Sequence, residues 1–440
     1  MIDCEPEIKV ALLQNYREAK ITLNGNFQLS DGSDITGFLN IRSIPGAVIL
    51  SDASGAQLAG SREVFLAAQE NSTFSLEVKI GIDFHWQQTQ KQTFRGGILV
   101  QINPDSSFNF INNIPLEDYI TSVISSEMSA AAPLEFLKAQ AITARSWLVA
   151  MLDRKKRNVH APRIDDAGDD EIIRWYDTND HSLFDVCADD HCQRYQGITR
   201  ITSANAAKAV QATHGIYLVY DNVICDARYY KACGGRTEIF PTAWEDKNLP
   251  FLQSISDSAT GLPPLDSEEE VRNWLTERPP AYCNTRDKTL LGRILPFFDQ
   301  ETIDFYRWQV SYAREELEEI LYKKSGIDFG TLQNLTPVKR GPSGRISKLK
   351  IEGTKRTVIV GKELEIRRWL SPSHLLSSAF VVSTRHSQTG AVECFILDGG
   401  GWGHGVGLCQ IGAAVMASRG FKAENILAHY FVHSRLQKLY

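Results

Sequence analysis

The pattern of apolar and polar positions predicts β-strands along the first hundred residues. Segments 8–13, 19–23, 74–80 and 97–102 are rich in β-branched residues, and several alternate apolar with polar positions. Gly, Asn, Asp and Ser separate these segments, as is typical of strands joined by turns. Residues 1–104 are therefore expected to form a β-rich N-terminal region.

After Pro115 the apolar residues recur at helical spacing. They are Leu116, Tyr119, Ile120, Val123 and Ile124. Pro133 opens a second predicted helix, and Glu127 is expected in the connection just before it. Lys138 and Arg145 are seven residues apart on that second helix, so they share one of its faces. This spacing allows two cations and one carboxylate to converge on a single groove.

The remaining chain mixes short strands, turns and one helical stretch. Residues 257–334 contain proline pairs, an acidic run and a charged helix, which indicates a mostly helical insertion or accessory lobe. Residues 105–256 and 335–440 are expected to form one mixed sheet-and-helix core, which we interpret as the catalytic core. The predicted fold class is α+β, with a β-rich N-terminal region, this mixed core and the helical insertion.

Composition narrows the functional classes. Of 440 residues, 43% are apolar and 23% are charged, a balance typical of a folded globular protein. The net charge of -6 gives no basic footprint for nucleic acid. No apolar stretch is long enough to span a bilayer, and no basic segment followed by an apolar one marks an export signal. Either the protein is cytoplasmic, or a signal has been removed.

Glu127 is a candidate general acid/base. Protonating a glycosidic oxygen requires a carboxyl group held where water is scarce, and neighbouring cations stabilise the charge that develops. The alternative is a solvated glutamate beside a salt-bridged helix.

A second candidate is the segment 399–407, which holds six glycines in nine residues. So many glycines disfavour a helix and let the backbone approach a ligand closely. Trp402 can stack on a sugar ring, and His404 is expected to be exposed because its neighbours lack side chains. A glycine-rich turn with a structural histidine is the alternative.

The third candidate is a metal site. His181, Cys187, His191 and Cys192 lie within twelve residues and offer two thiolates and two imidazoles, which suits a closed tetrahedral zinc site. The alternatives are a disulfide between the two cysteines, or two reduced thiols.

Further cysteines lie in apolar or glycine-rich surroundings. They are Cys225, Cys233, Cys394 and Cys409. A thiol nucleophile at Cys409 is disfavoured because no papain-like signature surrounds it.

Three ordered blocks resemble the stage II sporulation protein D / amidase enhancer (SpoIID/LytB) family. The first comprises Ile-Pro-Leu-Glu-Asp-Tyr-Ile at 114–120, Ser-Glu-Met at 126–128 and Leu-Lys-Ala-Gln-Ala-Ile-Thr-Ala-Arg-Ser at 137–146. The second comprises Thr-His-Gly at 213–215 and Tyr-Tyr-Lys-Ala-Cys-Gly-Gly-Arg-Thr-Glu at 229–238. The third is Gly-Trp-Gly-His-Gly-Val-Gly-Leu-Cys-Gln-Ile-Gly-Ala at 401–413, followed by Ile-Leu-Ala-His-Tyr-Phe at 426–431.

The resemblance implies a lytic transglycosylase acting on peptidoglycan strands that lack stem peptides. Glu127 would be the catalytic acid/base, supported by Lys138 and Arg145. The groove would be partly walled by Tyr229 and the His404 segment. Trp402 and Gln140 are the further substrate-binding residues that the matched motifs imply, and zinc binding by the His/Cys cluster is reported for some relatives.

In this mechanism one carboxylate suffices, because the sugar's own 6-hydroxyl attacks and a 1,6-anhydro product forms. A second carboxylate, for which Asp118 and Asp398 are the candidates, would support hydrolysis instead. Two other functions stay open. One is a non-catalytic module that binds wall glycan and stimulates an amidase, and the other is a zinc-dependent hydrolase. The resemblance also implies a periplasmic or extracellular, cell-wall-associated location.

Overall fold

The computed structural model describes residues 3–81, 87–157, 170–176, 181–261, 265–300, 302 and 304–440. The chain forms two compact units. Unit 1 comprises residues 1–141, 178–216 and 438–440, and unit 2 comprises residues 142–177 and 217–437. Among the described residues, no helix combines the length and the apolar character that crossing a membrane requires.

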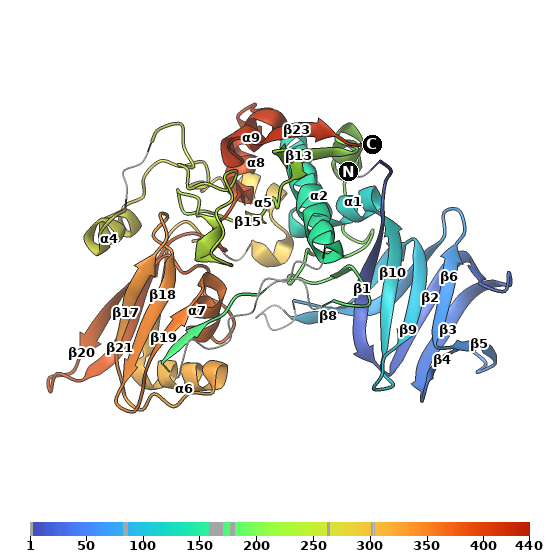
Figure 1. Cartoon of the computed structure of the whole chain (residues 1–440), viewed down its shortest axis with the longest axis horizontal. Helices are drawn as coiled ribbons and strands as arrows, with labels where there is room; N and C mark the ends of the chain where they lie inside the picture. The colour runs from blue at the N-terminus through green and yellow to red at the C-terminus, as the bar shows by residue number, and fades with distance from the viewer. Residues whose placement is uncertain are drawn as a thin grey trace. The chain divides into compact units, whose positions relative to one another are not determined.

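Unit 1 is built on one large, mostly antiparallel sheet, whose strands lie side by side in Figure 1. The strand order is β12-β1-β10-β9-β6-β2-β3-β4-β5, with β7 paired to β2 and β8 paired to β7. The strands are β1 (Glu7–Tyr16), β2 (Glu18–Leu29), β3 (Asp34–Ile44), β4 (Ala47–Ser51), β5 (Gln57–Ser61), β6 (Glu63–Ala68), β7 (Thr73–Ile80), β8 (Gln88–Arg95), β9 (Gly97–Ile102), β10 (Phe108–Pro115) and β12 (Val186–Cys187). The predicted β-rich N-terminal region is confirmed.

Aromatic side chains from four strands pack against one another in the core of unit 1. Phe74 on β7 stacks on Phe94 on β8, with ring centroids 5.4 Å apart, and also contacts Phe27 and Phe110. All four side chains are fully buried. Because side chains alternate between the two faces of a strand, the period of two seen in the sequence places these rings on one buried face.

Two helices follow the sheet directly. β10 ends at Pro115, and α1 (Leu116–Glu127) begins at the next residue, with Glu117 and Asp118 in its first turn where acidic groups favour the helix dipole. α2 (Leu134–Lys156) follows, and its residues up to position 141 belong to unit 1. α3 (Ala204–Ala212) is capped by Ser203, whose hydroxyl accepts the N–H of Asn205. The two helices predicted after Pro115 are therefore confirmed.

Two of the sheets in unit 2 are ordered β11-β19-β18-β17 and β16-β21-β20. The elements are β11 (Glu171–Ile173), β16 (Trp308–Ala313), β17 (Leu332–Arg340), β18 (Ile346–Gly353), β19 (Thr357–Gly361), β20 (Phe380–His386), β21 (Val392–Gly399), α4 (Glu268–Thr276), α5 (Lys288–Ile294), α6 (Arg314–Ser325) and α7 (Glu363–Trp369). Trp369, Leu317, Ile351 and Phe395 belong to the core that α6 and α7 share with these sheets.

The stretch 257–334 contains α4, α5 and α6, and it also contributes a strand. β16 pairs with β21 along its whole length, from Trp308 opposite Gly399 to Ala313 opposite Cys394. Sheet pairing thus ties this stretch to residues close to the C-terminus. The overall α+β class is confirmed, and the domain boundaries drawn from the sequence stay predictions.

The remaining elements are short and lie mostly in unit 2. They are β13 (Ile216–Tyr220), β14 (Val223–Ile224), β15 (Tyr229–Tyr230), β22 (Leu408–Cys409), β23 (Arg435–Lys438), the 3-10 helices η2 (Phe240–Thr242) and η3 (Phe297–Asp299), α8 (Gln410–Ser418) and α9 (Ala423–Tyr430). β15 and β22 pair in parallel, and the backbones of Ala232 and Trp402 exchange hydrogen bonds of 2.7 and 3.0 Å. The glycine-rich segment is therefore held by its backbone against residues 229–232.

Gly407 is a position where this close approach excludes a side chain. It has φ of +86°, and a Cβ there would lie 2.2 Å from the carbonyl oxygen of Arg228. Gly420 has φ of +92°, but a Cβ there would meet nothing within 4 Å.

We expect Gly407→Ala to destabilise the protein by about 2–4 kcal/mol, because a backbone clash adds to the strain of a left-handed alanine. Gly420→Ala is the matched control and should cost only about 1 kcal/mol, from strain alone. Urea unfolding of the two variants measures the difference. Equal destabilisation would contradict the proposed close packing at Gly407.

Candidate functional site

Glu127 is the last residue of α1, so it ends the helix and does not lie in the connection that follows, as was predicted. Met128 has extended backbone angles, which ends the helix there. The Glu127 residue is only 9% exposed, and its Oε1 accepts the backbone N–H of Arg194 at 3.0 Å. A carboxylate in this position is shielded from bulk water, as a general acid requires.

The segment that presents this N–H is itself anchored in unit 1. The Tyr195 ring stacks on Tyr119 of α1, with centroids 5.2 Å apart, and lies 5.7 Å from Phe94 of β8. Its hydroxyl donates to Oδ1 of Asn112 at 2.5 Å, and the Tyr119 hydroxyl donates to Oε1 of Gln193 at 3.1 Å. The position of the Arg194 N–H thus follows from aromatic packing against the sheet and α1.

The predicted polar residues of α2 differ in their environments. Lys138 forms an ion pair of 2.8 Å with Glu135 on the same helix. Gln140 is fully buried, and both ends of its amide lack a hydrogen-bond partner among the described residues. Arg145 is also fully buried, in the part of α2 that belongs to unit 2, where its guanidinium lies 5.9 Å from the Tyr217 ring centroid. Convergence of Lys138 and Arg145 with Glu127 stays a prediction.

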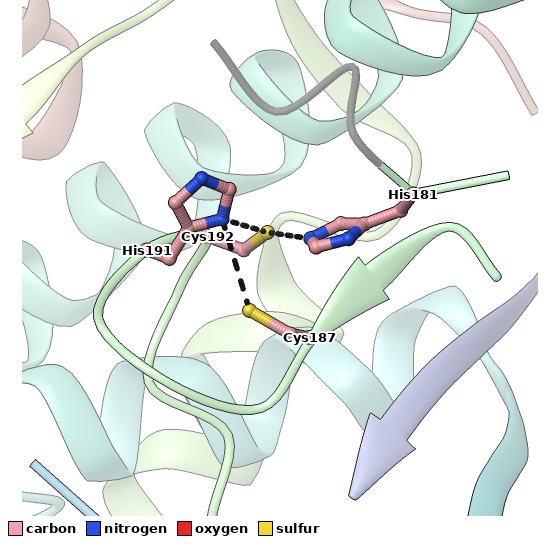
Figure 2. Close-up of side chains that lie close together, drawn as sticks. All are labelled: His181, Cys187, His191 and Cys192. Atoms are coloured by element: carbon pink, nitrogen blue, oxygen red, sulfur yellow. Dashed lines mark hydrogen bonds between the residues drawn. The ribbon is translucent and has the colours of Figure 1, made fainter. Parts of the chain in front are cut away.

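The four predicted metal ligands gather in one place (Figure 2). The Cys192 sulfur lies 3.5 Å from Nε2 of His181 and 3.6 Å from Nδ1 of His191, and the Cys187 sulfur lies 3.9 Å from the same Nδ1. All four ligand atoms lie within 4.8 Å of one another. Bonds of about 2.3 Å to sulfur and 2.0–2.1 Å to nitrogen separate the ligands of a tetrahedral zinc by about 3.4–3.8 Å. The donor set and its spacing therefore fit a zinc ion.

The electrostatics of this cluster favour thiolate. The pKa of Cys187 lies well below that of an ordinary thiol. The hydrogen bond with Cys192 is the largest cause, and the hydrogen bonds with the imidazoles of His181 and His191 add to it. Cys187 lies on β12, which pairs in parallel with β1, so one ligand is fixed by the sheet. The cluster ends two residues before Arg194. A metal here would pin the loop that positions the N–H bound by Glu127.

The second carboxyl group beside Glu127 is Asp190, which the sequence analysis did not single out. Burial raises the pKa of Asp190 to about 7, its ion pair with Arg194 opposes this shift, and the charge of Glu127 adds to it. The two earlier candidates lie elsewhere. Asp118 is exposed in the first turn of α1, and Asp398 on β21 accepts a hydrogen bond of 2.7 Å from Gln309.

His404 is partly buried, so its predicted exposure was wrong. Its ring centroid lies 5.3 Å from that of Tyr230 and 4.8 Å from that of Trp244, and its Nδ1 accepts the N–H of Val406 at 3.1 Å. Burial, and then the nearby arginines 228 and 345, lower the pKa of His404, which keeps the imidazole neutral. The glycines next to His404 in the sequence have no side chains, so aromatic residues from other segments of the chain pack against its ring.

The other two predicted contacts lie around this histidine. Trp402 and Tyr229 are both partly exposed, and Tyr229 is the first residue of β15, opposite Leu408 of β22. Unit 2 therefore brings together Tyr229, Trp402 and His404, whereas unit 1 brings together Glu127 and the His/Cys cluster. Cys409 is fully buried.

We expect Tyr195→Phe to destabilise the protein by about 1–2 kcal/mol, because it leaves the buried Asn112 carbonyl without its hydrogen-bond donor. Ring stacking is retained in this variant. Tyr16→Phe, at a partly exposed tyrosine of the same unit, is the control and should change stability by less than about 0.5 kcal/mol. Urea unfolding provides the measurement, and an unchanged Tyr195→Phe protein would contradict the anchoring role.

Comparison with known proteins identifies relatives of this chain. Residues 104–220 match the family model described as Stage II sporulation protein, and residues 238–407 match a domain of unknown function (DUF8618). Stage II sporulation protein D of Bacillus amyloliquefaciens is 26% identical over 326 residues, which are 74% of this chain and 75% of that protein.

Two Bacillus subtilis proteins align similarly. Stage II sporulation protein D is 25% identical across 74% of this chain and 76% of its own length. The amidase enhancer is 23% identical across 71% of this chain and 39% of its own length. The segment matched by the sporulation-protein model contains Glu127, the polar residues of α2 and the whole His/Cys cluster. The predicted resemblance to the stage II sporulation protein D / amidase enhancer (SpoIID/LytB) family is therefore confirmed, with the sporulation-protein domain at residues 104–220.

Proposed function

We propose that this protein is a lytic transglycosylase that cleaves peptidoglycan glycan strands lacking stem peptides, between N-acetylmuramic acid and N-acetylglucosamine. The observation that carries the proposal is the buried carboxylate of Glu127, held by the Arg194 N–H within the segment that matches the family. Burial restricts water, and transfer of the glycosidic bond to an internal hydroxyl needs water to be kept away.

The proposed reaction uses one carboxyl group twice. Glu127 in its acid form donates a proton to the glycosidic oxygen, and the bond from this oxygen to C1 of N-acetylmuramic acid breaks. The resulting carboxylate then takes the proton of the same sugar's 6-hydroxyl as that oxygen bonds to C1. The products are a 1,6-anhydro end and a free 4-hydroxyl on N-acetylglucosamine, and Glu127 is again protonated.

Other residues are proposed to bind and orient the glycan. Lys138 and Arg145 would stabilise negative charge on the substrate. Gln140 holds a buried amide with neither end paired among the described residues, and such a group gains more than most from a hydrogen bond to a sugar. In unit 2, Trp402 and Tyr229 offer aromatic faces, and His404 offers a neutral imidazole.

We also propose that His181, Cys187, His191 and Cys192 hold a structural zinc ion. Four protein ligands complete a tetrahedral shell, so no position is left for a reacting water. Zinc would therefore stabilise the loop that carries the Arg194 N–H, whereas a zinc-dependent hydrolase needs an open position on the metal. The chemistry is assigned to Glu127 alone.

The rival function is a glycan-binding module that stimulates a separate cell-wall amidase. One relative is named amidase enhancer, which favours this alternative. Both functions place the protein outside the cytoplasm, at the cell wall. They differ in their dependence on Glu127, because a binding module does not need an acid/base.

We expect Glu127→Gln to reduce cleavage of purified, peptide-free glycan strands by about 10²–10⁴-fold, since an amide cannot donate the required proton. Mass spectrometry of the products is the measurement, and wild type should yield 1,6-anhydro ends. Glu117→Gln is the matched control. Glu117 lies on the same helix, is 8% exposed and accepts the N–H of Gly215 at 3.2 Å, so this variant should keep full activity.

The product type separates the remaining outcomes. Reducing ends in place of anhydro ends would contradict transglycosylation and indicate hydrolysis. No cleavage by wild type, together with retained glycan binding and stimulation of an amidase, would favour the binding module.

We expect Cys187→Ser to remove zinc from this site and to reduce glycan cleavage by about 100-fold, since loss of the metal displaces the loop that holds Glu127. Zinc is measured by elemental analysis beside the cleavage assay. Cys394→Ser changes a buried cysteine of unit 2 that lies 3.0 Å from the Ser311 hydroxyl, and it should retain zinc and activity. Full cleavage by a protein without zinc at this site would contradict the structural role.

A further inference from the structure

Unit 2 contains a second group of side chains with the chemistry of metal ligands. Three cysteines and one aspartate converge there from four separate segments of the chain. They are Cys233 after β15, Asp257, Cys283 and Cys409 at the end of β22. Cys233 is 3% exposed and the other three residues are fully buried.

The ligand atoms lie at the spacing of a tetrahedral shell. The sulfur atoms of Cys233 and Cys283 are 3.4 Å apart, and all four ligand atoms lie within 4.8 Å of one another. Two sulfurs on one zinc ion are separated by about 3.8 Å. The bonded sulfurs of a disulfide are only about 2.05 Å apart, and a disulfide would use two of these three thiols. The group therefore has the size and the number of donors that a single metal ion requires.

Backbone N–H groups donate hydrogen bonds to two of the three sulfurs. The N–H of Cys233 donates to the sulfur of Cys409 at 3.3 Å, and the N–H of Gly235 donates to the sulfur of Cys233 at 3.3 Å. Hydrogen bonds from amides to sulfur stabilise thiolate ligands in metal sites. Gly235 has φ of +107°, so this turn directs its N–H back towards the sulfur in a conformation that favours glycine.

Asp257 is held in place for the same role. Its Oδ2 accepts the N–H of Cys283 at 2.8 Å, and its Oδ1 accepts the Tyr430 hydroxyl at 2.5 Å. Each carboxylate oxygen has a second lone pair available. A fully buried carboxylate is costly without a cation, and none of the ion pairs among the described residues includes Asp257.

Two buried arginines offset the charge that three thiolates and a carboxylate would bring. Arg307 donates to the carbonyl of Gly234 at 2.9 Å, and Arg345 donates to the carbonyl of Cys233 at 3.3 Å. Arg345 is fully buried and Arg307 is 7% exposed. Their guanidinium groups are positively charged at all ordinary pH values, so positive charge lies beside the turn that carries Cys233.

We propose that Cys233, Asp257, Cys283 and Cys409 form a second structural zinc site, separate from the His/Cys cluster of unit 1. Thiolate ligands select zinc among the common closed-shell divalent cations, and four protein ligands leave no open position. Binding would release the thiol protons to solvent.

The site would join segments that share little regular structure. Cys233 and Cys283 are 50 residues apart, and Cys233 and Cys409 are 176 residues apart. Zinc would fasten the turn after β15, the segment before α5 and the start of α8 to one another. β22 follows the glycine-rich segment 399–407 directly and ends at Cys409. The same metal would therefore fix the C-terminal end of the glycine-rich segment.

The test uses full-length protein in which Cys187 and Cys192 are both changed to Ala, so that the first cluster cannot contribute. We expect about one zinc per chain by elemental analysis, with three sulfur ligands and one oxygen by zinc X-ray absorption. Adding Cys283→Ser should lower the zinc content at least tenfold, whereas adding Cys394→Ala should leave it unchanged. The same X-ray absorption measurement on wild-type protein does not depend on whether a variant folds. It should show five sulfur ligands in total, shared between two zinc ions.

Several results would overturn the proposal. One is a wild-type protein whose zinc has only two sulfur and two nitrogen ligands. Another is a Cys233–Cys283 disulfide in mass spectra of protein purified without reductant. A third is a double variant that folds, by circular dichroism, but binds neither zinc nor the spectroscopic probe Co²⁺. Glycan cleavage is not used as a readout, so failure of the proposed transglycosylase would leave this test intact.

Discussion

Burial of one carboxylate is the constraint on which the architecture around the candidate site depends. Removing a charged group from water is costly unless protein groups replace the lost hydration, so Glu127 needs a donor in a fixed position. The Arg194 N–H meets that need at 3.0 Å. Backbone donors have no rotamer freedom, which means that the geometry is set by whatever holds residues 193–195. The stacked tyrosines 119 and 195 and the Asn112 hydrogen bond provide that support.

The two proposed zinc sites bear on a related difficulty, which is to fix segments that have little regular structure. Residues 181–196 contain only two residues of regular strand, so they have few backbone hydrogen bonds of their own to define a conformation. The glycine-rich segment of unit 2 has the same weakness, since glycines contribute no side-chain packing and lose much conformational freedom on folding. In each case cysteines gather next to the irregular backbone. A metal that closes such a group supplies binding free energy where apolar burial is small.

The sequence predicted what is encoded by local periodicity or by a contiguous motif. Alternation revealed the strands of unit 1, helical spacing revealed α1 and α2, and the His/Cys cluster was found because its members lie within twelve residues. Features built from distant segments were missed. Cys283 and Asp257 give no spacing signal, and Trp244 reaches His404 through the fold alone. The glycines around His404 suggested exposure, whereas the space they leave is filled by rings from elsewhere.

The placement of carboxyl groups bears on the choice between hydrolysis and transglycosylation. Glycoside hydrolases use two carboxyl groups about 5–9.5 Å apart. Asp118 precedes Glu127 by nine residues on α1, which is two and a half turns, so the two side chains leave opposite faces of the helix about 13.5 Å apart along its axis. Asp190 is engaged by Arg194, the residue whose N–H already holds Glu127. The proposed attack by the sugar's own 6-hydroxyl would need neither of them, because Glu127 alone would donate the first proton and accept the second.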